Sequence, residues 1–285
     1  MQKIAFIILA WNSDKYIRAC IESIYTLKNY ESQILAVDNG SDDDTPSILE
    51  RLAKKCPTQC TLRVITYKRN KGTTISRNAA IKNIDTDVDY ICILDSDTLI
   101  NEKAVKILAQ ELERNPQYGI VGPRMMNSKG QIQVSGRRFP TFTEKLLKAI
   151  PLKCCQIWGE RLQWLPEEHE EKSYPVDYLM SACWWIRPET IKRAGLLDEK
   201  IFYAPEDAEY CIRVWKAGYQ VAFCPQAQII HEWQRLSKQR FFSRMNWEHI
   251  KGLAYMFWKH HYFFFTANIK REFRNASDQR YRSHI

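Results

Sequence analysis

Residues 1–115 alternate four times between a short apolar run rich in β-branched side chains and a segment whose apolar residues recur at helical spacing. Four successive strand–helix units favour a parallel sheet with helices on both faces. In such a sheet, ligands bind beyond the carboxyl ends of the strands, so the polar residues after each strand are the first site candidates. The predicted strands cover 4–10, 34–37, 62–67 and 88–94, and the predicted helices cover 17–27, a segment capped by Thr45 with Pro46 in its first turn, 73–83, and 101–114 with Asn101 as cap.

The alternation is weaker in the second half of the chain. Residues 122–171 lack clear periodicity and contain basic, Gly/Pro-marked and Trp-containing pieces, so we expect an elaborated loop region there. The sequence shows no internal repeat and no low-complexity segment. Beyond residue 171 we expect strands at 176–186 and 219–223, a helix at 188–194 closed by Gly195, and a helix from Glu206-Asp207 to Gly218.

Acidic residues follow two of the predicted strands, at Asp38 and at Asp95-Ser96-Asp97. In extended backbone, the carboxylates of Asp95 and Asp97 point to one side and can present oxygens to one divalent cation. Mn²⁺ or Mg²⁺ held in this way keeps open positions for substrate phosphates. Ordinary turn chemistry explains the same residues, because Asp, Asn, Ser and Gly dominate turns.

Two further candidates lie late in the sequence. Glu206-Asp207 is expected at a helix N-terminus, where the helix dipole keeps carboxylates ionised and weakens them as bases. One of the two could still act as a general base, or both could be plain helix-end electrostatics. His231 follows two isoleucines and is either a core histidine or a metal ligand.

The motifs occur together in one order. They are Ala10-Trp11-Asn12, the string Asp38-Asn39-Gly40-Ser41-x-Asp43-x-Thr45, Asn70-x-Gly72 with Arg77-Asn78, Asp95-Ser96-Asp97, Phe202-Tyr203-x-x-Glu206-Asp207-x-x-x-Cys211-x-Arg213, and His231. This set resembles glycosyltransferase family 2, the sugar transferases of GT-A fold, over about residues 3–235. The string that contains Glu206-Asp207 is most similar to rhamnosyltransferase-type enzymes that build bacterial surface polysaccharides.

The resemblance implies a role for each motif. The nucleotide of a UDP- or dTDP-sugar donor would contact Ala10, Trp11, Asn12, Asp38, Asn39, Arg77, Asp95 and Ser96. Asp97 and His231 would hold Mn²⁺ or Mg²⁺. Asp207 would be the catalytic base, with Glu206 as its substitute, in an inverting transfer to a hydroxyl of a glycan or polyprenyl-linked glycan acceptor.

The resemblance also implies a domain plan. A GT-A catalytic domain, an α/β fold with a Rossmann-like mixed sheet, would cover 1–235, with a nucleotide-binding half at 1–121 and an acceptor-binding half at 122–235. A helical tail would cover 236–285.

Two other functions remain open. A sugar nucleotidyltransferase would need a Gly-rich phosphate loop where Trp11-Asn12-Ser13 stands. A non-catalytic carbohydrate- or lipid-binding protein on the same scaffold would not need the acidic residues that are retained here.

The positive charge is concentrated at the C-terminus. The chain has 42 Lys+Arg and 33 Asp+Glu, a net charge of +9, and residues 232–285 hold 11 basic and 4 acidic residues, which contributes +7 of it. Aromatic residues are interspersed, which suits an anionic membrane surface. The alternative is a helix that packs Leu253, Met256, Phe257 and His260 onto the domain. No nucleic-acid module accompanies the charge, so nucleic acid is not an expected partner.

The sequence also favours a compartment. The apolar run 4–11 is eight residues long, whereas a bilayer span needs about 20, and Trp11-Asn12 is a poor signal-peptide cleavage site. Nine cysteines, several within apolar runs, suggest buried thiols in a reducing environment. We expect a cytoplasmic protein, either free or peripheral at the inner face of the cell membrane.

Overall fold

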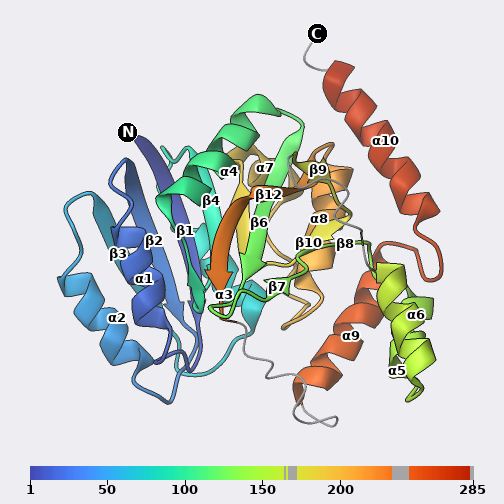
Figure 1. The fold of residues 1–285 in the computed structure, drawn as a ribbon, viewed down its shortest axis with the longest axis horizontal. Helices are drawn as coiled ribbons and strands as arrows, with labels where there is room; N and C mark the ends of the chain where they lie inside the picture. The colour runs from blue at the N-terminus through green and yellow to red at the C-terminus, as the bar shows by residue number, and fades with distance from the viewer. Residues whose placement is uncertain (164, 166–171, 233–243, 283–285) are drawn as a thin grey trace.

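A ten-stranded mixed sheet forms the centre of the molecule, with strand order β3-β2-β1-β4-β11-β6-β12-β5 (Figure 1). The computed structural model describes residues 1–163, 165, 172–232 and 244–282. The first four strands are parallel, as predicted. They are β1 (Gln2–Ala10), β2 (Tyr30–Asp38), β3 (Cys60–Thr66) and β4 (Tyr90–Asp95).

The predicted helices cover both faces of this parallel half. Side chains of β1 alternate between two cores, with Phe6 in one and Ile7 in the other. The first core packs against α1, α2 and α4, and the second packs against α3, so the two-faced arrangement is confirmed. These helices are α1 (Ile17–Tyr25), α2 (Thr45–Lys54), α3 (Thr73–Ile81) and α4 (Glu102–Arg114).

One of the two predicted helix caps is confirmed. The Asn101 side chain accepts a hydrogen bond from Ala104 N over 2.9 Å at the start of α4. The cap predicted at Thr45 is wrong, because Asp44 occupies the cap position and Thr45 is the first residue of α2. The Thr45 hydroxyl instead accepts a hydrogen bond from Ser13 N, 2.8 Å away, and so ties α2 to the loop after β1.

The loop region predicted at 122–171 is wrong. This stretch contributes most of a central strand, two short strands and two helices, namely β6 (Tyr118–Met126), β7 (Ile132–Gln133), β8 (Gly136–Arg137), α5 (Phe142–Ala149) and α6 (Lys153–Gln163). Glycine misled the prediction because it serves close packing here. A Cβ atom at Gly122 would lie 2.8 Å from Leu179 Cδ1.

The apolar run 176–186 forms two strands rather than one, β10 (Tyr178–Leu179) and β11 (Cys183–Ile186). The short helix α7 (Pro188–Ala194) is confirmed, and α8 (Glu206–Lys216) begins where predicted. The last strand, β12 (Gln220–His231), is longer than predicted and crosses a register shift between Cys224 and Gln228. The edge strands β5 (Thr98–Leu99) and β9 (Tyr174–Pro175) complete the sheet.

Two C-terminal helices, α9 (Arg244–Lys259) and α10 (Ala267–Arg282), pack on the second core. Met256, Phe257 and His260 are buried and Leu253 packs against this core, which agrees with packing on the domain, one of the two alternatives that the sequence left open. The boundary predicted between residues 235 and 236 lies outside the described residues, as do the tail aromatics Trp233, Phe241 and Phe242. No helix within the described part of the chain is long and apolar enough to span a bilayer.

Candidate active site

Two adjoining cavities open at the carboxyl ends of the parallel strands. The first is about 410 Å³ and the second about 230 Å³, and both are lined by Leu9, Asp95 and His231. Seven predicted site residues line the first cavity, namely Trp11, Asn12, Asn39, Asp95, Ser96, Asp97 and His231. Three others, Arg77, Glu206 and Asp207, line the second together with Asp95 and His231.

Asp95, Asp97 and His231 form a potential metal site. One ligand atom from each lies within 4.8 Å of the other two, and His231 Nε2 is 3.2 Å from Asp97 Oδ1. The approach of the two carboxylates does not come from extended backbone, as the sequence suggested, because Asp97 lies in the turn between β4 and β5. Pairing of β12 with β5 places His231 opposite Thr98, beside that turn.

The surroundings of His231 suit a ligand role. Its Nδ1 lies 2.5 Å from Oε1 of Gln133, so a hydrogen on Nδ1 can be donated there while Nε2 faces Asp97. Burial lowers the pKa of His231, but the hydrogen bond to Asp97 and the charges of Asp97 and Asp95 raise it by more. The pKa therefore lies above its usual value. Two carboxylates and one imidazole provide a donor set for Mn²⁺ or, with water ligands, Mg²⁺.

Arg77 lines the second cavity and connects acidic groups at the end of β4 and the start of α8. It is 3% exposed, and its Nη2 donates to Asp95 Oδ1 over 2.8 Å. Nη1 donates to Glu206 Oε1 over 3.3 Å, and Nη2 also reaches the Ser181 carbonyl. Its guanidinium therefore joins the end of β4 to the start of α8, and its predicted contact with the donor nucleotide stays a prediction.

The two acidic residues at the start of α8 differ in surroundings. Glu206 is buried, and it accepts hydrogen bonds from Arg77 and from Ser181 Oγ at 3.0 Å. Burial, followed by the charge of Asp207, raises the pKa of Glu206 to about 8. Asp207 is half-buried, and burial also raises its pKa, against its hydrogen bond from Ala208 N. Burial thus outweighs the helix dipole, and both carboxylates are better bases than their position in the sequence suggested.

Asp38 and Asn39 at the end of β2 have structural partners. Asp38 is 1% exposed and Ala10 is fully buried, and neither lines the two cavities. Oδ1 of Asp38 accepts a hydrogen bond from Ser41 N over 3.1 Å. The Asn39 side chain accepts hydrogen bonds from Lys71 N and Ser76 Oγ, and donates to Asn70. Asn39 therefore fixes the loop that leads into α3.

The loop after β1 forms another wall of the first cavity. Trp11 is 42% exposed over the cavity. Asn12 has a φ of 49° and accepts a hydrogen bond from Asp42 N through its side chain. The hydroxyl of Ser13 lies 2.9 Å from that of Ser96, which links this wall to the metal-site turn.

Several cavity residues were not identified as site residues from the sequence. Gln133 and Met180 lie in segments that carried no motif, whereas Tyr203 lies in the string that contains Glu206 and Asp207. The signal for Gly72 in the sequence is its place in the Asn70-x-Gly72 motif, and the structure explains the glycine. Its φ is 88°, and its contact with the Phe202 carbonyl leaves no room for a side chain. Thr73 N donates to that carbonyl over 2.7 Å, which joins the two halves of the site.

This chain is similar to known proteins of one family. Residues 5–189 match the profile of the family described as Glycosyl transferase family 2. The chain is 24% identical over 209 residues to an N-acetylglucosaminyl-diphospho-decaprenol L-rhamnosyltransferase from Mycobacterium tuberculosis, a match that covers 70% of this chain and 66% of the relative. This chain thus spans just under two thirds of that relative's length.

Two solved structures share the fold. TarS 1-349 from S. aureus in complex with UDP-GlcNAc gives a TM-score of 0.61 at 17% identity, over 97% of this chain and 71% of that chain. The mannosyltransferase PcManGT from Pyrobaculum calidifontis in complex with GDP-Man and Mn²⁺ gives 0.60 at 15% identity, over 90% and 63%. The fold is the GT-A type that the motifs predicted. Because the profile match covers more than half of the sequence, the chain belongs to glycosyl transferase family 2.

Proposed function

We propose that this chain is an inverting glycosyltransferase that moves a sugar from a nucleotide-sugar donor to a hydroxyl group of a glycan or polyprenyl-linked glycan. One observation carries the proposal. The cluster of Asp95, Asp97 and His231 and the carboxylate of Asp207 line adjoining cavities, and Arg77 joins Asp95 to Glu206, the neighbour of Asp207. A site that places a cation and a base side by side suits displacement of a charged leaving group by a hydroxyl.

The residues divide the chemistry between them. Asp95, Asp97 and His231 would hold Mn²⁺ or Mg²⁺, which stabilises negative charge on the departing nucleoside diphosphate. Asp207 takes the proton from the acceptor hydroxyl, whose oxygen bonds to the anomeric carbon as the bond from that carbon to the diphosphate breaks. Attack from the face opposite the leaving group inverts the configuration. Glu206 serves less well because Arg77 and Ser181 already occupy its carboxylate.

The donor nucleotide would lie in the larger cavity, between the loop after β1 and the metal-site turn. Trp11, Asn12 and Ser96 offer its walls. Contact of Asp38, Asn39 and Ala10 with the nucleobase stays a prediction, because Asp38 and Ala10 are buried outside the two cavities and Asn39 fixes the loop that carries Asn70. TarS, which shares the fold, has been solved with UDP-GlcNAc, and this supports UDP as one candidate beside dTDP.

The acceptor proposal rests on the relatives and on one exposed surface. The mycobacterial relative is named for a diphospho-decaprenol substrate. Exposed apolar side chains gather on α5, α6, α9 and the segment after α9, and the rings of Phe142 and Phe264 lie 5.7 Å apart across this surface. Figure 1 shows these three helices together at one end of the molecule. We propose that this surface contacts an anionic membrane at its cytoplasmic face.

A donor screen tests the enzyme proposal. UDP-, dTDP- and GDP-sugars are added with and without Mn²⁺ or Mg²⁺ while unfolding temperature and binding heat are measured, because a ligand of the folded state raises stability. A metal-dependent shift with one nucleotide supports the transferase and identifies its donor class. No shift with any donor would leave the non-catalytic scaffold as the better description. Cosedimentation with anionic vesicles tests the membrane surface, and no binding at low salt would exclude it.

A further inference from the structure

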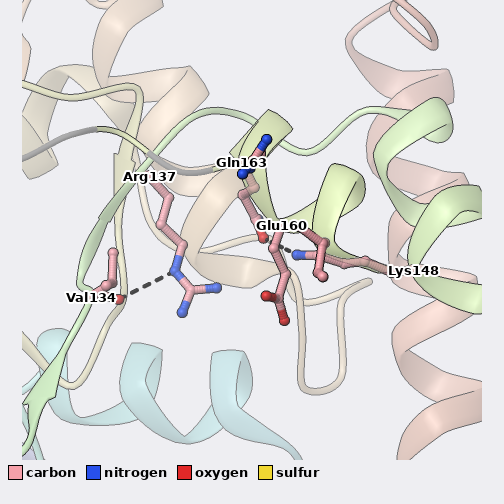
Figure 2. A pocket seen from close by; sticks show the side chains of 7 residues that line it. Val134, Arg137, Lys148, Glu160 and Gln163 are labelled. Carbon is pink, nitrogen blue, oxygen red and sulfur yellow. Dashed lines mark hydrogen bonds between the residues drawn. The ribbon is translucent and has the colours of Figure 1, made fainter. Parts of the chain in front are cut away.

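A third cavity, of about 430 Å³, lies between the β7–β8 segment and the pair α5 and α6, outside the site described above. Its walls carry three cations, Arg137, Lys148 and Arg161, and one carboxylate, Glu160. Figure 2 shows Arg137 and Glu160 extending into the same space, with Lys148 reaching toward it from α5. The other lining residues, Val134, Ile157 and Gln163, include no aromatic ring on which a nucleobase could stack.

Hydrogen bonds hold two of the cations in place. Arg137 donates through Nε to the Val134 carbonyl over 3.3 Å, and in Figure 2 the rest of its guanidinium faces the cavity. Nζ of Lys148 lies 2.7 Å from Oε1 of Gln163 and 2.7 Å from the buried carboxylate of Glu144. Because Lys148 is already paired with Glu144, the guanidinium groups of Arg137 and Arg161 are the main candidates to bind an anion, since planar guanidinium groups bind phosphate oxygens in pairs.

This cavity is close to the proposed base. Arg137 pairs with Tyr178 across β8 and β10, and Ser181, three residues beyond Tyr178, contacts Glu206. Three extended residues span at most about 10 Å. Burial raises the pKa of Asp207, and the charge of Arg137 opposes that rise, so the two groups interact electrostatically.

We propose that this basic cavity binds the phosphate or diphosphate group of the acceptor, with the sugar directed toward Asp207. The inference rests on the proposed transferase function and specifies its acceptor class. The outer face of α6 agrees with a lipid on that group, since Ile157 lines the cavity and Trp158 beside it is 63% exposed. The negative charge of Glu160 would repel a bound phosphate, so removal of that charge should strengthen phosphate binding.

Binding of inorganic pyrophosphate to the full chain, measured calorimetrically with a metal chelator present, tests the cavity without any transfer reaction. Arg161→Glu should weaken this binding by about tenfold or more, and Glu160→Gln should tighten it. Lys153→Glu is the matched control, because Lys153 is exposed on the same helix and does not line the cavity. If the parent does not bind pyrophosphate, or if Arg161→Glu binds it as the parent does, the proposal is wrong even where transfer is observed.

A second experiment identifies the source of the phosphate. Transfer is compared for one glycan in three forms, namely phosphate-free, on a short soluble diphosphate, and on a long-chain diphosphate in anionic vesicles. Arg161→Glu should raise KM for both diphosphate forms and leave the phosphate-free glycan unchanged. A defect confined to vesicles would assign Arg161 to the membrane surface and overturn the cavity assignment. Absence of transfer with every form would refute the transferase and leave the pyrophosphate result intact.

Discussion

Nη1 of Arg77 in α3 lies 3.3 Å from Oε1 of Glu206 at the start of α8, and both side chains are almost fully buried. The same guanidinium holds Asp95 at 2.8 Å. One side chain therefore fixes the relative position of the proposed metal site and the proposed base. Disruption of this link should affect stability and activity together.

Arg77→Met should lower the free energy of unfolding by about 2 kcal/mol, because the carboxylates of Asp95 and Glu206 lose their charged donor. Urea denaturation measures the change. Arg18→Met is the control, since Arg18 pairs with Glu22 on the surface, where both side chains are half exposed, and such pairs contribute less than about 1 kcal/mol. Equal losses in the two variants would mean that the Arg77 link is not stabilising.

Glu206 should make stability depend on pH. Its pKa rises from 4.5 to about 8 on folding, chiefly through burial. Between these values the native state keeps a proton that the unfolded chain has lost, so stability falls as pH rises through this window and the loss is complete above pH 8. Glu206→Gln should therefore gain stability relative to the parent between pH 5 and 8. Denaturation at several pH values checks this, and a constant difference would contradict it.

Asp207→Asn should lower turnover by about a hundredfold or more, because the amide cannot take the acceptor proton. Donor binding should change little, since Asp207 lies in the smaller cavity. Turnover is measured with the donor found in the screen, and the dissociation constant by calorimetry. Near-normal turnover would move the base to Glu206 or elsewhere.

Asp97→Ala should abolish the part of donor binding that depends on Mn²⁺ or Mg²⁺, because it removes one of three clustered ligands. Calorimetry with and without the cation separates this part from the rest. Asp42→Asn, an exposed carboxylate on the loop after β2, is the control. A parent-like metal response in Asp97→Ala would refute the assignment.

Gly252→Ala should destabilise the protein by about 1 kcal/mol or more through overpacking. A Cβ atom there would collide with the Ala204 carbonyl and lie 3.0 Å from Pro205 Cδ, just ahead of Glu206. Turnover should fall too, because the start of α8 must shift. Lys251→Ala is the control, because Lys251 is exposed on the same helix, and it should change neither melting temperature nor turnover. If Gly252→Ala behaved like the parent, α9 could shift to accept the methyl group and the prediction would be wrong.

The first half of the fold was predictable because β1, β2 and β4 bury continuous apolar runs and because α1, α2 and α4 bury an apolar face. The central strand β6 was not predictable in this way, because Gly122 and Pro123 are typical loop residues in a sequence. Only the approach of Leu179 explains Gly122. The site, too, was predictable only in part.

Asp95, Asp97 and His231 were identified through a resemblance in motif order, and the structure brings them together. The buried position of Arg77 could not be read from the sequence. Its partners Asp95 and Glu206 come from distant elements, and no spacing along the chain records their contact. The structural role of Asn39 could not be read from the sequence either. Its motif was expected to contact the nucleotide, but its side chain fixes the loop that leads into α3.

The burial of Met256 and Phe257 from α9 and of Ile269 and Phe273 from α10 in the second core limits how this chain can be recombined with its relatives. A chimera cut after β12 would inherit the carboxylates but leave the hydrophobic surface behind α8 uncovered. The smallest exchangeable unit therefore runs from the start of the sheet through α10, and grafts that alter acceptor choice should be confined to α5, α6 and the strands beside them.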